Sequence, residues 1–229
     1  MAPETTPTAE ELVHTIHGVL YPVEQRIRQH AYLQALEEAS IAPTRLRRFV
    51  GEQGHIIPGD LRSIALLISR CTEPASQAFF RAVLEGEAAA LEALEPLATA
   101  AGMSPADRAT YEPTPGAQAY SAYLAWLCLY GSAAEVAAAL SVNFAAWGAN
   151  CGRMAQALRQ HYGFQADDVR FFTQFAAAPP DVSPQALALI EADLHRGVEA
   201  PRIVRAARML QSYELMFWDT MYTLSTEGG

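Results

Sequence analysis

The stretch SYELMFWDTMY, residues 212–222, places Glu214 among aromatic and other apolar side chains near the C-terminus. If the stretch is helical, Leu210, Phe217 and Met221 share one apolar stripe. Glu214 follows the first of them by four residues and precedes the second by three, so it lies on or beside that stripe. Burial would raise the pKa of such a carboxyl group toward the range that a general acid or base needs. Two interpretations stay open: Glu214 lines a cavity and transfers protons, or it reaches solvent or a structural hydrogen-bond network.

Helical periodicity extends over nearly the whole chain. Alanine and leucine dominate, and no strong run alternates polar with β-branched residues. The pattern predicts an all-α bundle that forms a single domain over residues 9–226, after a flexible tail over residues 1–8. The expected helices span about 9–40, 43–71, 75–101, 117–130, 132–161 and 169–177, with two more from about 184 and 201. We expect a bend at Pro22 and a kink or break at Pro58, because proline lacks the N–H that a helix interior uses.

The composition is that of one folded domain. The chain has 229 residues, of which 51% are hydrophobic, and a net charge of −9. Because an acidic chain repels phosphate backbones, we expect no nucleic-acid partner. We also expect no membrane contact and a cytoplasmic location, since no apolar stretch is long enough to span a membrane and the N-terminal residues are unlike a signal peptide. The spacing of Cys71, Cys128 and Cys151 favours isolated buried thiols over a zinc site or a disulfide framework.

A resemblance to a known family narrows these possibilities. The pattern E-x-x-F-W-D-x-x-Y over residues 214–222 resembles the C-terminal helix of the TenA/PqqC family, which includes thiaminase II and has the heme oxygenase-like fold. Three earlier stretches resemble that family in order and spacing: HAYLQALEEASIAPTRLRRFVGEQGHI from residue 30, AYSAYLAWLCLYGSAAEVAAAL from residue 119 and SVNFAAWGANCGRMAQALRQHYGF from residue 141. The resemblance covers roughly residues 20–225. It implies a heme oxygenase-like bundle and a homodimer or homotetramer.

The resemblance also implies an activity and a site. In this family a pocket holds an aminopyrimidine or thiamin-like metabolite, and a hydrolysis takes place without a cofactor. The catalytic glutamate of the C-terminal helix matches Glu214, which we expect to act as the acid/base group. The polar groups and aromatic walls that we expect around the small-molecule ligand are Glu52, Gln53, His55, Tyr120, Trp147, Phe171 and Phe217.

The chain departs from the family pattern at two functional positions. Gln53 stands where the family has the aspartate that binds the pyrimidine, so this side chain offers a donor and an acceptor but no charge. The family's cysteine falls around Asn143-Phe144, where neither a thiol nor the glutamate used by a subgroup is present. The resemblance therefore supports the fold more strongly than thiaminase chemistry, and a changed substrate or reaction stays open.

Two other functions remain as alternatives. Glu52-x-x-His55 resembles the Glu and His pair of heme oxygenase-like di-iron oxidases, which implies a non-heme iron oxidase. The matching later stretch FFTQFAAAPPDV, from residue 171, lacks the histidines that such a centre needs, so we expect no metal and leave a cofactor-free oxidase as a variant of this alternative. The third possibility is a non-catalytic ligand-binding or interaction protein of the same fold.

Overall fold

The computed structural model describes residues 6–177 and 182–226, and these residues form an all-α fold, as predicted. Within them lie ten α-helices and one short 3-10 helix, and no strand is present among them. The helices are α1 (Ala9–Arg28), α2 (Ala31–Glu37), α3 (Leu46–Arg70), α4 (Pro74–Ala100), α5 (Pro105–Ala109), α6 (Pro115–Tyr130), α7 (Ala133–His161), α8 (Arg170–Ala176), α9 (Pro184–His195) and α10 (Ala200–Thr226); the 3-10 helix is η1 (Pro43–Arg45). Among the described residues, no helix combines the length and the apolar composition that crossing a membrane would require.

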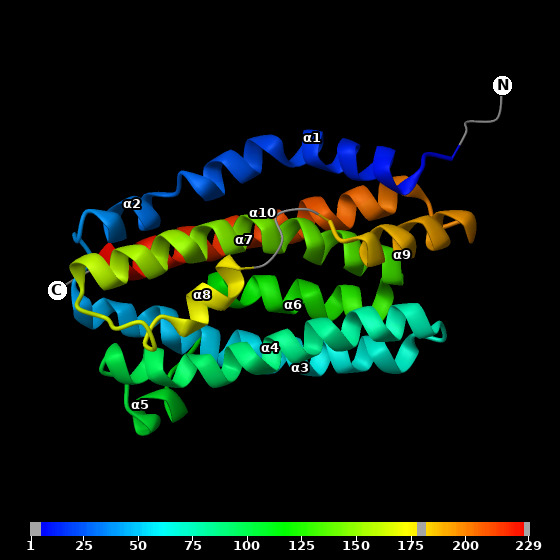
Figure 1. Cartoon of the computed structure of the whole chain (residues 1–229). Helices are drawn as coiled ribbons and strands as arrows, with labels where there is room; N and C mark the ends of the chain where they lie inside the picture. The colour runs from blue at the N-terminus through cyan, green and yellow to red at the C-terminus, as the bar shows by residue number, and fades with distance from the viewer. Residues whose placement is uncertain (1–5, 178–181, 227–229) are drawn as a thin grey trace.

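The long helices run along one common direction, with α7 and α10 through the middle of the molecule (Figure 1). On one side of this pair lie α1 and α2, and on the other side lie α3 and α4 (Figure 1). Helix α6 packs against both α3 and α10, while the short α8 packs against α7 and α4. The space enclosed by α3, α4, α6, α7, α8 and α10 is therefore bordered by segments that are far apart in the sequence.

Neither of the two prolines interrupts its helix, so of the kink or break expected at Pro58 the break does not occur. Pro22 and Pro58 lie inside the continuous helices α1 and α3. In both helices the residue four positions earlier, whose carbonyl the proline ring approaches, is a glycine with open space around its Cα (Gly18 and Gly54). A glycine backbone can tilt away from the ring at low cost, which accounts for the continuity.

The expected helix over 9–40 instead breaks at His30. The His30 ring accepts a hydrogen bond from the Tyr32 backbone N–H at 3.2 Å and so caps α2. Its other ring nitrogen lies 3.1 Å from Asp219 Oδ1 on α10. The break therefore occurs where one side chain both starts a new helix and joins it to the C-terminal helix.

Side chains cap the first turns of α1 and α9. Residues 1–5 of the expected flexible tail lie outside the described residues. Thr8, at the end of that tail, forms a capping box with Glu11 and so starts α1. Further along the chain, Ser183 caps α9 through its side chain.

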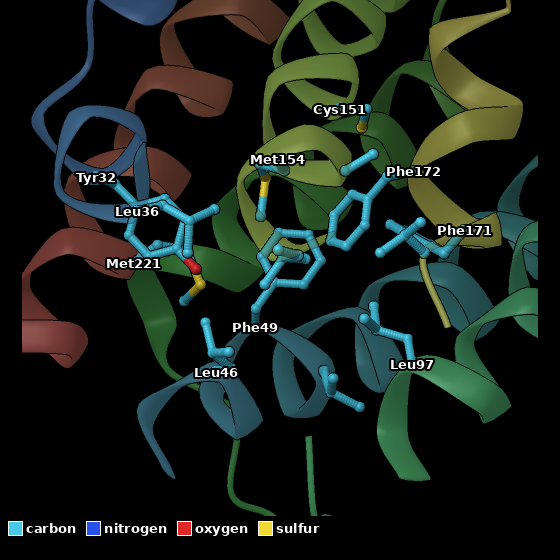
Figure 2. Close-up of a cluster of buried hydrophobic side chains, with 14 of the residues drawn as sticks. Tyr32, Leu36, Leu46, Phe49, Leu97, Cys151, Met154, Phe171, Phe172 and Met221 are labelled. Carbon is cyan, nitrogen blue, oxygen red and sulfur yellow. The ribbon is translucent and has the colours of Figure 1, made fainter. Parts of the chain in front are cut away.

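A cluster of aromatic side chains packs the N-terminal end of α3 against α7, α8 and α10. Figure 2 shows Phe49 of α3 pointing toward Met154 of α7 and Phe172 of α8. The ring of Phe49 lies 5.2 Å from that of Phe172 and is stacked on Trp147 at 6.2 Å. Such offset and edge-to-face pairs stabilise a core beyond the area that they bury.

The contact between α7 and α8 depends on one glycine. A Cβ at Gly148 would lie 2.6 Å from the Phe175 carbonyl oxygen, whereas a Cβ at Gly152, one turn later, would meet Ala176 at an ordinary 3.5 Å. We expect Gly148→Ala to lower the free energy of unfolding by about 1–3 kcal/mol, because two backbones must move apart. Gly152→Ala, the matched control, should leave it unchanged or raise it by up to about 1 kcal/mol through helix propensity. Urea denaturation of both variants measures the difference, and equal effects would contradict this close approach.

Candidate functional site

A partly open cavity of about 40 Å³ lies between α3, α4, α6, α7, α8 and α10. One ordered water needs roughly 10–15 Å³, so the cavity has room for about three waters unless side chains move. Its apolar walls are formed by Ile56, Ile57, Phe144, Trp147, Phe175 and Phe217. Its polar lining is formed by Gln53, Asp60, Glu87, Tyr120, Asn143 and Glu214.

Glu214 faces this cavity with both carboxylate oxygens held. The side chain is 2% exposed. Asn143 Nδ2 donates to Glu214 Oε2 at 2.6 Å, and the Trp218 indole N–H donates to Oε1 at 3.0 Å. Asn143 is oriented in turn by the Tyr120 hydroxyl, which donates to Asn143 Oδ1 at 2.9 Å. Three helices therefore fix the position of one carboxyl group.

The surroundings of Glu214 favour its protonated form. Burial raises its pKa from 4.5 to about 8, although the hydrogen bonds from Trp218 and Asn143 oppose this shift. A carboxyl group with this pKa carries a proton at neutral pH and can give it to a bound molecule. The two N–H donors then stabilise the carboxylate that remains.

The raised pKa predicts a pH-dependent stability. Between pH 4.5 and about 8, Glu214 holds a proton in the folded chain but not in the unfolded chain. The free energy of unfolding should therefore fall as pH rises through this window, by roughly 1 kcal/mol per pH unit from this group. Asp60 and Glu87 act in the same direction, so the informative quantity is a difference. We expect Glu214→Gln to fall less steeply than the wild type in denaturation series from pH 5 to 8; parallel curves would show an unshifted pKa.

The side-chain amide of Gln53 has no hydrogen-bond partner among the described residues. Its side chain is 4% exposed, lines the cavity, and makes no hydrogen bond with any described residue. Buried amides are normally paired, so a free one beside a cavity indicates a place for a ligand or water. The amide offers one acceptor and two donors at this position.

Comparison with known proteins identifies the family of the chain. A family model described as the TENA/THI-4/PQQC family matches residues 19–224. The chain belongs to this family. The resemblance seen in the sequence motifs is thereby confirmed. Comparison with curated proteins gives no sequence match.

Solved structures similar to this TENA/THI-4/PQQC protein show the fold. A TenA homologue from Pseudomonas syringae superposes with a TM-score of 0.78 at 13% identity, covering 96% of this chain and 97% of that one. A domain of unknown function with a heme oxygenase-like fold, from Shewanella denitrificans, gives 0.72 at 12% identity and covers 96% and 94%. A candidate TenA-like thiaminase from Sulfolobus solfataricus gives 0.61 at 12% identity and covers 95% and 97%. The chain has the heme oxygenase-like fold.

The cavity brings together five of the predicted site residues, namely Gln53, Tyr120, Trp147, Glu214 and Phe217. Phe171 is not among the lining residues. It is fully buried in the aromatic core, where its ring lies 5.1 Å from that of Phe172. Phe175, one turn later on α8, lines the cavity instead. The difference arises because α8 turns the earlier ring toward α3.

Glu52 and His55 do not line the cavity either. Glu52 points toward the chain before α6 and accepts hydrogen bonds from the Tyr111 hydroxyl, the Thr114 N–H and hydroxyl, and the Gln118 amide, at 2.9–3.2 Å. The exposed His55 bonds to the Tyr111 carbonyl oxygen at 3.0 Å. Their partners are protein groups, and the described residues contain no cluster of three or more His, Cys, Asp or Glu suited to a metal. These residues therefore do not fit the iron centre of the oxidase alternative.

The sequence analysis did not predict three polar residues that line the cavity, namely Asn143, Asp60 and Glu87. Asn143 was recognised only as the position without a thiol, yet it positions Glu214. Asp60 follows Gln53 by seven residues on α3, a spacing that signals the same helix face. Glu87 carries no local signal, because α4 has several glutamates at helical positions.

Cys151 lies in the apolar core (Figure 2), where burial raises the pKa of its thiol well above the usual range.

Proposed function

We propose that this protein binds a small planar metabolite of the aminopyrimidine or thiamin type and hydrolyses a C–N bond in it. The observation that carries the proposal is Glu214, a buried carboxyl group with a pKa of about 8 that faces the cavity and accepts hydrogen bonds at both oxygens. Membership in the TENA/THI-4/PQQC family supports the substrate class. The name of the Sulfolobus relative supports the reaction.

In the proposed reaction, water forms the new C–O bond while the C–N bond breaks. Protonated Glu214 gives its proton to the leaving nitrogen, and the attacking water returns a proton to the carboxylate. The sum is the addition of one water across the C–N bond. Water is the proposed nucleophile because the family's thiol position falls around Asn143-Phe144 and no cysteine is among the described lining residues.

In this proposal, Gln53 and the aromatic walls of the cavity bind the planar ligand. The free amide of Gln53 can pair with an edge that carries one donor and one acceptor, as an aminopyrimidine does. Trp147 and Phe217, whose rings lie 5.8 Å apart at 67°, form one wall and offer apolar contact to a ring. A ligand of this size would require side chains around the small cavity to move.

The proposal is tested by incubating the purified protein with thiamin and a panel of aminopyrimidines. Release of the free amine or ammonia, and of the matching alcohol, is followed by chromatography. We expect product from at least one compound that also raises the melting temperature. A compound that binds without product would favour the non-catalytic alternative, for which the missing thiol is the supporting observation. Absence of both binding and product across the panel would contradict the substrate class.

A further inference from the structure

Two more carboxyl groups line the cavity, and the proposed reaction uses neither of them. Asp60 of α3 and Glu87 of α4 are 3% and 9% exposed. Ser121 Oγ donates to Asp60 Oδ1 at 2.5 Å. Glu87 accepts no hydrogen bond and forms no ion pair with any described residue. A buried carboxyl group that faces a cavity without a partner indicates a missing partner in the ligand.

When the pair ionises, none of the described residues that line the cavity supplies a cation to balance its negative charge. Burial raises the pKa of both carboxyl groups, and the charge of Asp60 raises that of Glu87 further. Asp60, Glu87 and Glu214 also raise the pKa of Tyr120, after the larger effect of its burial. No arginine or lysine is among the described residues that line the cavity. Buried charges are normally compensated by a partner of opposite sign, which the described lining residues do not supply.

Glu87 also lines a groove that lies next to the cavity. Together with Phe144 and Phe175 it lines both the cavity and a groove of about 840 Å³ between α4, α8 and α9. Apart from these shared residues, the groove is lined mostly by small and apolar side chains, five of them alanines. A ligand that enters along this groove therefore passes beside Glu87.

We propose that Asp60 and Glu87 form a binding site for a positively charged nitrogen group of the ligand, an amidinium or a protonated amine. The inference rests on the proposed function in that the ligand occupies the same cavity. One N–H of the cation donates to the unpartnered Glu87, and another donates to Asp60, which Ser121 orients. Phe144 and Phe175 line the same end of the cavity and add cation–π attraction.

The test compares two probes of nearly equal shape, the cation benzamidine and the neutral benzamide. Calorimetry at pH 7.5 should show benzamidine binding to the wild type at least about tenfold more tightly than benzamide. Glu87→Gln removes the charge without breaking a hydrogen bond of the free protein. We expect this variant to lose about tenfold in benzamidine affinity and to bind benzamide as the wild type does. Asp60→Asn should reduce the preference in the same direction.

The matched control is Glu85→Gln, an exposed residue two positions earlier on α4. It should keep the full preference for benzamidine. Equal binding of the two probes to the wild type, an unchanged preference in Glu87→Gln, or no benzamidine binding at millimolar concentration would overturn the inference. Glu214→Gln separates the two proposals: it should lose turnover but keep the preference for the cation.

Discussion

Replacing Glu214 by glutamine is expected to lower kcat by about 10²–10⁴-fold, the usual range for loss of a general acid or base. Glutamine keeps the length and shape of the side chain, but only its amide oxygen can accept, so one of the two hydrogen bonds from Asn143 and Trp218 is lost. The variant carries no transferable proton at this position. Because the amide still fills the same wall of the cavity, ligand affinity should stay within about threefold of the wild type.

Two measurements make this expectation specific. Single-turnover kinetics reports the chemical step, and calorimetry reports the affinity. The exposed Glu199, which directly precedes α10, provides a matched control, and Glu199→Gln should leave both quantities unchanged. A Glu214→Gln protein with normal kcat would remove this residue from the mechanism. Equal losses in affinity and kcat would mean that Glu214 binds the ligand instead.

Replacing Glu52 by alanine is expected to lower the free energy of unfolding by about 3 kcal/mol. The change leaves the Tyr111 hydroxyl, both donors of Thr114 and the Gln118 amide without their acceptor. Each unsatisfied buried donor costs about 1–3 kcal/mol, and solvent near the Tyr111 end recovers part of the loss. For a domain of this length, such a loss lowers Tm by roughly 6–12 °C.

His55→Ala is the comparison that separates a structural role from an iron site. His55 is exposed and makes one hydrogen bond, to the Tyr111 carbonyl oxygen. Its loss should change the free energy of unfolding by less than about 1 kcal/mol. Calorimetric melting of both variants, with and without ferrous iron, measures these effects. If Glu52→Ala melted like the wild type while iron stabilised the wild type alone, the oxidase alternative would be restored.

The sequence predicted the fold better than the site. Helix periodicity and the ordered motifs were enough for the bundle and the family, and Glu214 was found because it interrupts an apolar stripe. The rotation of each helix was not available. Neighbouring residues on a helix point about 100° apart, so Gln53 faces the cavity while Glu52 faces the chain before α6. The same rotation separates Phe175 from Phe171.

Contacts between side chains on different helices could not be predicted from the sequence either. Asp60 and Glu87 lie on different helices, and only the packing of α3 on α4 brings the two carboxyl groups to one cavity. The break at His30 depends on Asp219, almost the whole chain away. Such contacts follow from tertiary packing, which a local pattern does not encode.

The three acidic side chains around one small cavity affect the outcome when variants of this protein are selected for thermal stability. Each of Asp60, Glu87 and Glu214 has a raised pKa, so each costs the empty protein stability when it ionises. A library screened for heat resistance alone would therefore enrich amides at these positions. The selected variants would be more stable but would lack the acidic groups of the cavity. A screen for stable variants must therefore also select for ligand binding.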